Sequence, residues 1–144
     1  MAGMDDPRIY NLFISHCWSY DDEYIRLVNL LNNAPDFYWK NYSVSFDNPL
    51  AGGSRKKLAE EIDRQIRLAS AVLVISGIYV SHRKWIQFEI NLADEYNKPI
   101  VGIVPRGNLN IPAAIRRSAW DIVNWSTNSI VDSIITVTEM RREE

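Results

Sequence analysis

Cysteine and long hydrophobic runs are the two features that this sequence most clearly lacks. The single cysteine, Cys17, has no partner for an intramolecular disulfide. The unbroken apolar stretches span only a few residues, whereas a helix that crosses a bilayer needs about 20. The segment before residue 9 has neither a basic flank nor an apolar signal region. We therefore expect a protein of the reducing cytoplasm with no membrane segment.

The sequence also has little net charge. Sixteen basic and eighteen acidic side chains give a net charge of −2, so no bulk positive field favours binding to a polyanion. Nucleic acid is therefore not the expected partner. With 144 residues, of which 47% are hydrophobic and 24% charged, the chain has the size and composition of one globular domain over residues 1–144.

Three common site motifs are missing. His16, Cys17 and His82 do not have the spacing of a zinc site, so we expect no metal. Gly52-Gly53-Ser54 lacks the Gly-Lys-Ser/Thr sequel of a P-loop. No Gly-x-Gly-x-x-Gly follows the first apolar run, which excludes the usual dinucleotide fingerprint.

Five short apolar runs alternate with four longer segments of helical periodicity, which predicts an α/β fold with a parallel sheet between two helical layers. The third and fourth runs are almost uniformly apolar and should be central strands. The expected strands are Ile9–Ile14, Tyr42–Phe46, Ala71–Ile75, Ile100–Val104 and Ile122–Trp125. The expected helices begin after the N-caps Ser19 and Ser54 or span about Lys84–Tyr96 and Asn128–Met140.

The second run alternates polar and apolar residues, as an edge strand does, and fits the flavodoxin-like, three-layer fold with strand order 2-1-3-4-5. In that order ligands bind outside the carboxyl ends of strands one and three, where the winding direction reverses. The segments expected at this position are Ser15–Trp18, Asp47–Leu50, Ser76–Tyr79 and the first turns of the third helix.

One carboxylate, that of Glu89, is predicted to face the core, which is unusual for an ionisable group. The third helix has an apolar stripe that includes Trp85 and Ala93, and the helical period places Glu89 between them, facing inward. An ionised carboxylate in a core costs several kcal/mol unless it is paired or opens onto a cleft. Glu89 is either a buried partner of a base such as Arg83 or Lys84, or a functional group under the predicted ligand crevice.

The neighbouring loops supply further candidates. The Ser15 hydroxyl and the loop amides could bind a phosphate or ribose, and Trp18 could be a stacking wall or a packing residue. Ser15-His16 could instead be a nucleophile and base, but adjacent residues usually point apart and no orienting acid is visible. Asp47-Asn48 is first a turn signal, and Asp47 could also accept ribose hydroxyls. Ser76 ends the third strand at the same edge.

Three segments together resemble a TIR domain, and more narrowly the TIR-like proteins of bacterial Thoeris antiviral defence. They are Tyr10–His16, Ala71–Ser76 and Ser81–Ile90, and the resemblance extends over nearly the whole chain. The most specific element is Trp85-x-x-x-Glu89 after the third strand. By this resemblance Glu89 matches the catalytic glutamate of NAD-cleaving TIR enzymes. Ser15, His16 and Trp18 match the loop that lines the nucleotide site, and Asp47, Asn48 and Pro49 match the loop that often gates it.

The resemblance implies an NAD+ glycohydrolase or ADP-ribosyl cyclase, for which NAD+ is the substrate and no cofactor is needed. It implies a cyclic ADP-ribose isomer as product, a separate effector protein that senses it, a phage-derived activator and self-association. Ser15-His16-Cys17-Trp18 departs from the Ser-Tyr-type opening of animal and plant TIR domains, so substrate pose and product do not carry over from those.

Three alternatives share the topology. A non-enzymatic TIR-like interaction module would leave Glu89 with a structural role. A phosphoacceptor receiver domain needs acidic residues where this chain has Ser15-His16 and Ser76. A flavodoxin needs a run of small hydroxyl residues after the first strand, which this chain lacks.

Overall fold

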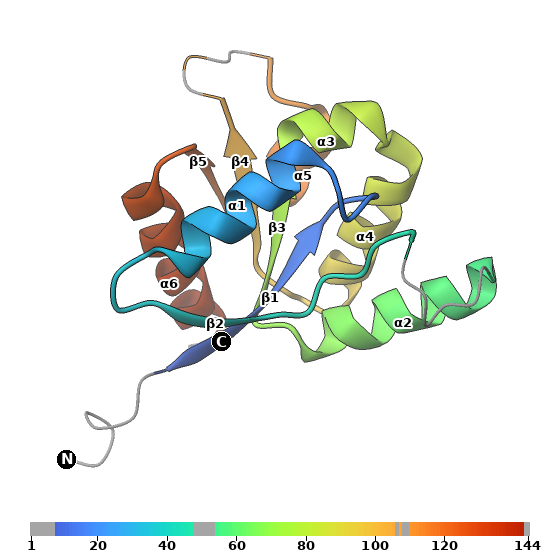
Figure 1. Ribbon diagram of the computed structural model, residues 1–144, viewed down its shortest axis with the longest axis horizontal. Helices are drawn as coiled ribbons and strands as arrows, with labels where there is room; N and C mark the ends of the chain where they lie inside the picture. Colours follow the sequence, from blue (N-terminus) through green and yellow to red (C-terminus); the bar gives the residue numbers. More distant parts are fainter. Residues whose placement is uncertain (1–7, 48–53, 106, 108–109, 143–144) are drawn as a thin grey trace.

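The computed structural model describes residues 8–47, 54–105, 107 and 110–142. A five-stranded, wholly parallel sheet in the order β2-β1-β3-β4-β5 forms its centre, which confirms the predicted flavodoxin-like α/β topology (Figure 1). The strands are β1 (Ile9–Ser15), β2 (Tyr38–Asn41), β3 (Ala71–Ile75), β4 (Ile100–Val104) and β5 (Asp121–Asn124). The helices are α1 (Asp22–Asn32), α2 (Arg55–Leu68), α3 (Ser76–Ser81), α4 (Arg83–Glu95), α5 (Ala113–Ser118) and α6 (Thr127–Arg142).

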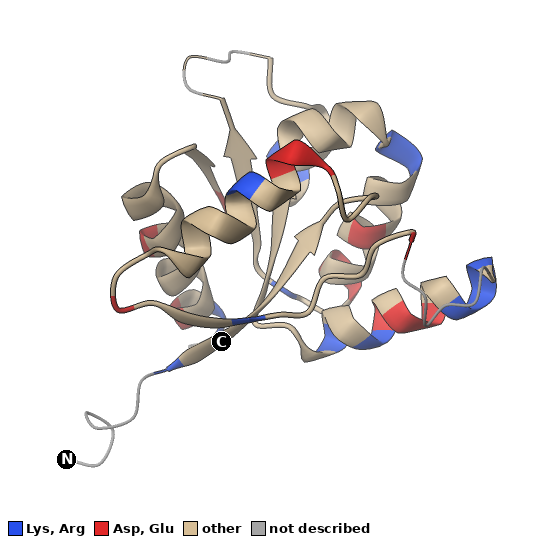
Figure 2. Cartoon of the chain, viewed as in Figure 1, with Lys and Arg blue, Asp and Glu red and all other residues tan. Residues whose placement is uncertain are grey.

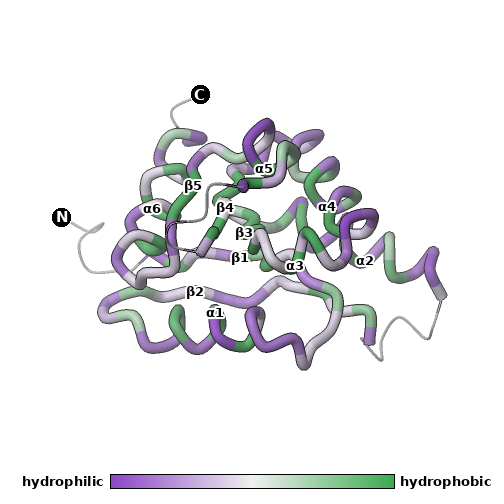
Figure 3. Tube along the Cα trace, turned by 90° about the horizontal axis from the view of Figure 1, so that it is seen from above, coloured by the Kyte–Doolittle hydropathy of each residue, from purple (hydrophilic) through white to green (hydrophobic). Residues whose placement is uncertain are grey.

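Helices cover both faces of the sheet. α1 and α6 pack together on one face, and α2 packs beside α4 on the other, with α5 next to α4. All five residues of β3 and of β4 are buried, as the uniformly apolar runs predict. Hydrophobic residues gather along these central strands, while hydrophilic residues lie mainly on the outer helices (Figure 3). No helix within the described ranges is both long and apolar enough to span a bilayer.

The second strand lies earlier than predicted. β2 comprises Tyr38–Asn41 and pairs in register with the first half of β1, beginning with Tyr38 opposite Ile9, so the predicted strand Tyr42–Phe46 is wrong. The ladder ends because the Ile14 amide donates to the Ser43 hydroxyl (2.8 Å) rather than to a main-chain carbonyl. The Phe46 amide donates to the Cys17 carbonyl (2.7 Å), so this segment still follows the end of β1.

The helix starts are partly as predicted. Ser54 caps α2 by accepting from the Lys57 amide. Ser19 does not cap α1, because Asp21 accepts from the Glu23 and Tyr24 amides and so takes the N-cap position. The sequence reading missed α3 and α5, since six residues are too few to establish a helical period. α3 matters most, because it replaces the loop expected between β3 and the helix that carries Glu89.

We predict that Gly102→Ala, in the centre of β4, lowers stability by about 1–3 kcal/mol. A Cβ at Gly102 would lie 2.7 Å from Cγ2 of Ile115, and the stiff β-branched side chain cannot rotate away. Gly77→Ala in α3 is the control, because its Cβ would meet only the flexible end of Glu23 and alanine favours a helix. Urea denaturation measures both. Equal stability of the two variants would contradict this account of β4 packing.

Candidate active site

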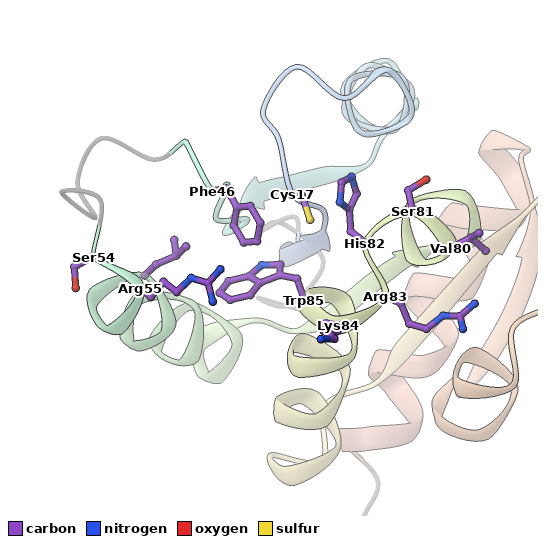
Figure 4. Close-up of a pocket in the computed structure, with 11 residues that line it drawn as sticks. Cys17, Phe46, Ser54, Arg55, Val80, Ser81, His82, Arg83, Lys84 and Trp85 are labelled. Carbon is purple, nitrogen blue, oxygen red and sulfur yellow. The ribbon is translucent and has the colours of Figure 1, made fainter.

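A cavity of about 780 Å³ lies at the edge of the sheet where β1 and β3 end. This volume is in the range of small-molecule sites. Its walls come from the segment after β1, the segment after β2, the start of α2 and the junction of α3 with α4 (Figure 4). The lining residues are Cys17, Phe46, Ser54, Arg55, Leu58, Val80, Ser81, His82, Arg83, Lys84 and Trp85.

Glu89 lies in the second turn of α4 and points inward, as its place in the helical period predicts. It is completely buried. One carboxylate oxygen, Oε1, accepts a hydrogen bond from the Ser15 hydroxyl at the end of β1. The other, Oε2, has no hydrogen-bond partner among the described residues. Neither does any base in the described ranges form an ion pair with it, so the alternative of a buried pair with Arg83 or Lys84 does not hold there.

Burial raises the pKa of Glu89 well above its usual value. The hydrogen bond from Ser15 opposes this shift, as does the nearby indole N–H of Trp85 one turn earlier. The indole nitrogen makes no well-formed hydrogen bond in the described residues. The closed site therefore favours the neutral acid, and a positive charge next to Oε2 would favour the ionised form.

Glu89 does not itself line the cavity, but two of its neighbours do. Trp85 lies one helical turn before it, and its ring lies against Phe46, with ring centroids 4.5 Å apart. Cys17 is also close, since burial and then the negative charge of Glu89 raise the pKa of its thiol to about 12. Glu89 is thus next to residues that line the cavity but is not itself part of the lining.

The structure brings Ser15 to Glu89 but gives His16 a different environment. The Ser15 hydroxyl donates to Glu89 and not to His16, so the two do not form a nucleophile and base. The His16 ring is buried and stacks on Tyr24 at 3.7 Å. Its Nδ1 lies 2.8 Å from the Ile14 carbonyl, which can only accept, so Nδ1 carries the proton and Nε2 accepts from the Ser45 hydroxyl. Burial lowers the pKa of His16, which favours this neutral ring.

Trp18 and Asp47 lie near the cavity without lining it. Trp18 is half-buried, stacks on Tyr20 and meets Phe46 edge-on at 5.4 Å, so it supports the cavity wall from behind. Asp47 is exposed and accepts from the Ser19 hydroxyl and amide. These hydrogen bonds lower the pKa of Asp47.

The remaining predicted residues differ in position. Ser76 is buried as the first residue of α3 and is not in the cavity lining. Trp85 does line it. Asn48, with Pro49 and Leu50, lies outside the described residues. Ligand contacts by any of these side chains stay predictions, as they do for Ser15, His16, Trp18 and Asp47.

Comparison with known proteins identifies the family. The sequence model described as "Thoeris protein ThsB, TIR-like domain" matches residues 13–110, which is more than half of the chain. The chain belongs to this family. No curated protein matches it. Among solved structures, a 3-dehydroquinate dehydratase-like protein from Bifidobacterium longum is 11% identical, with a TM-score of 0.46 over 92% of this chain and 98% of that chain.

Sequence reasoning missed several walls of the cavity in this Thoeris TIR-like domain. Phe46 was assigned to a strand, and His82 was considered only as a metal ligand. The run Arg55-Lys56-Lys57 is by its sequence most often a solvated helix face, although its place at a helix N-terminus also allows contact with an anion. The available signal was the position of Arg55 directly after the Ser54 cap, at a helix start where a cation is unfavourable. Within the described ranges, no three His, Cys, Asp or Glu side chains are grouped to hold a metal.

We predict that Glu89→Gln stabilises the fold at pH 8 and has little effect near pH 4. A folded-state pKa above the unfolded value means that stability falls as pH rises from about 4.5 toward the folded pKa, because ionisation is disfavoured only in the native state. Glutamine cannot ionise and can still accept from Ser15. We therefore expect Glu89→Gln to be more stable than the parent at pH 8, with the difference shrinking toward pH 4. Thermal unfolding across this pH range measures it, and a pH-independent difference would contradict the assignment.

Proposed function

We propose that this Thoeris TIR-like domain is an NAD+-consuming enzyme, an NAD+ glycohydrolase or ADP-ribosyl cyclase, with Glu89 as its catalytic group. It would cleave the bond between nicotinamide and ribose and release a cyclic ADP-ribose isomer. In antiphage defence, a separate effector protein would read this product as a signal. Family membership supports the defence role, and the site geometry supports the chemistry.

The observation that carries the proposal is the state of the Glu89 carboxylate. It is fully buried, it has one free oxygen within the described structure, and it lies beside a cavity large enough for a ligand. A buried carboxylate that lacks a basic partner costs stability, and proteins retain such groups mainly at functional sites. A purely structural glutamate would have a base or several donors around both oxygens.

The reaction needs little beyond one carboxylate. When the ribosyl C1′–N bond breaks, its electron pair goes to the pyridine nitrogen and nicotinamide leaves as a neutral molecule. The ribose becomes oxocarbenium-like, and an ionised Glu89 beneath it stabilises the positive charge, as carboxylates do in glycosidases. The positive charge of the bound nicotinamide ring also favours ionisation of Glu89 despite its raised pKa.

The surroundings of the cleaved ribose decide the product. Water capture at C1′, with loss of its proton, gives ADP-ribose, whereas capture by an adenine nitrogen or a ribose hydroxyl of the same molecule gives a cyclic product. Phe46, Leu58, Val80 and Trp85 supply the apolar part of the cavity wall. An apolar wall that excludes water and keeps the dinucleotide folded favours the intramolecular nucleophile.

Access to Glu89 requires movement of side chains. The carboxylate has no exposed surface and does not line the cavity, whereas its neighbour Trp85 does line it and packs against Phe46. We therefore propose that the resting protein has low activity, and that a phage-derived activator or self-association shifts these rings. This accounts for a catalytic group that is present but closed off.

The competing proposal is a non-enzymatic interaction module. The edge of the sheet favours it to some extent, because Ile9 and Tyr38 are paired there and each is half exposed. Such a module needs no orphaned carboxylate, however, and would release no nicotinamide from NAD+ at any protein concentration, with or without lysate from infected cells.

We predict that Glu89→Gln lowers nicotinamide release from NAD+ by about 100-fold or more, since the loss of one preorganised charge at a developing cation has an effect of this order. Glu95→Gln, an exposed change on the same helix, is the matched control and should retain the parent rate. Product chromatography and mass spectrometry at high protein concentration, with lysate from infected cells, measure both. Turnover by Glu89→Gln at the parent rate would exclude Glu89 as the catalytic group.

We predict that Trp18→Ala raises the KM for NAD+ roughly two- to tenfold, because Phe46 loses the aromatic contact that fixes it in the cavity wall. Trp18→Phe, which keeps an aromatic ring, should restore most of the affinity. Initial rates over a range of NAD+ concentrations test this. An unchanged KM in Trp18→Ala would assign Trp18 to packing alone.

A further inference from the structure

Two helices begin at the cavity, and both begin with cations. α2 opens with Arg55-Lys56-Lys57 and α4 with Arg83-Lys84, and neither has an acidic residue in its first turn. By contrast, α1 opens with Asp22 and Glu23 behind an aspartate cap. In Figure 2 basic residues accordingly mark the start of α2 and the start of α4, whereas acidic residues mark the start of α1.

Cations at a helix N-terminus oppose the helix dipole, which places partial positive charge there. No described carboxylate forms an ion pair with Arg55, Arg83 or Lys84, so nothing in the described structure neutralises this charge. Among the described residues, no acidic side chain lines the cavity either. The start of α4 also lacks a side-chain cap in the described residues. The cavity rim therefore concentrates positive potential at a cost in stability that a bound anion would offset.

The rim cations differ in where they point. The Arg83 guanidinium lies over the Tyr79 ring, 5.8 Å from its centroid, on the far side of the α3–α4 junction. Arg55 extends from the start of α2 toward Trp85, and the two side chains face each other along the cavity (Figure 4). Arg55 is exposed and has no described partner, so its guanidinium is free to bind a ligand.

A second observation, the unpaired oxygen of Glu89, indicates how a ligand bound at Arg55 would be oriented. Oε2 of Glu89 is buried and unpaired, and it lies one helical turn beyond Trp85, which is the residue that faces Arg55. A ligand that contacts both Arg55 and Glu89 must carry an anion for the guanidinium and, some distance away, a donor or cation for the carboxylate. The apolar wall between them suits a flat ring system.

We propose that Arg55 binds the diphosphate of the dinucleotide and so orients the nicotinamide ribose toward Glu89. The identity of the substrate rests on the proposed function. The guanidinium is suited to this role because its planar N–H groups match two phosphate oxygens at once. Arg55 is then a substrate-binding residue that selects diphosphate-bearing ligands over free nucleosides.

The test measures binding of ADP-ribose, which carries the diphosphate and lacks the scissile bond. Isothermal titration compares the parent with Arg55→Gln and with Lys56→Gln, which removes the same charge from the same helical turn at a position outside the cavity lining. We expect Arg55→Gln to weaken ADP-ribose binding about tenfold, because a charge-assisted hydrogen bond is lost. Lys56→Gln should stay within twofold of the parent. Neither change should lower the melting temperature, because each removes a cation from a helix N-terminus.

Equal weakening in the two variants would overturn the proposal, since it would show a general charge effect. Absence of ADP-ribose binding by the parent at millimolar concentration would overturn it as well. The proposed function has a separate readout, because nicotinamide release from NAD+ reports on Glu89. Arg55-dependent binding without cleavage would leave this inference standing and remove the enzymatic proposal. Cleavage of NAD+ by the parent, with unchanged ADP-ribose binding in Arg55→Gln, would leave the enzymatic proposal standing and remove this inference.

Discussion

The hydrogen bond from Ser15 to Glu89 joins the end of the first strand to the helix that follows the third, and the site depends on it. It is the one hydrogen bond that the described structure gives this carboxylate, whose other oxygen is left bare in a fully buried position. Burial raises the pKa of Glu89, and the Ser15 hydroxyl and the Trp85 indole only partly oppose that shift. The result is an acid held in a defined orientation but in an unfavourable environment.

A buried carboxylate with one unpaired oxygen lowers the stability of the fold, but it leaves that oxygen available to a ligand. A second donor or a nearby base would stabilise the fold, but in the proposed reaction it would also occupy the oxygen that faces the developing positive charge. The rim of the cavity likewise gives up stability, because arginine and lysine begin two helices that acidic residues would stabilise better. Both features lower the stability of the empty protein and would be relieved by a ligand that is cationic at one end and anionic at the other.

The rings of Trp85, Phe46 and Trp18 lie next to the two unfavourable features, the cationic rim and the buried carboxylate. Trp85 packs on Phe46, and Phe46 in turn meets Trp18, so the rings form a continuous set between the loop after β1 and α4. In the proposed function, a ligand in the cavity would meet the cationic rim before Glu89, because Glu89 does not line the cavity. Binding energy from the remote end of the substrate is then available to move these rings, which matches the low resting activity proposed for a defence enzyme.

Much of the fold follows from the sequence alone, because its signals are local. Uniformly apolar runs predicted the bounds of β3 and β4, alternation of strands and helices predicted the parallel sheet, and Ser54 marked the start of α2. The strand order came from a fit to the flavodoxin-like fold, and the order is confirmed although the second strand itself was misplaced. Helical periodicity also correctly predicted that the side chain of Glu89 points inward. Only the tertiary structure decided the rest. The position of β2 depends on where β1 offers main-chain partners, and the hydrogen bond of Glu89 depends on α4 packing beside the end of β1. The roles of Ser15, Phe46 and Arg55 come from contacts between residues distant in the chain, which no periodicity within one segment encodes.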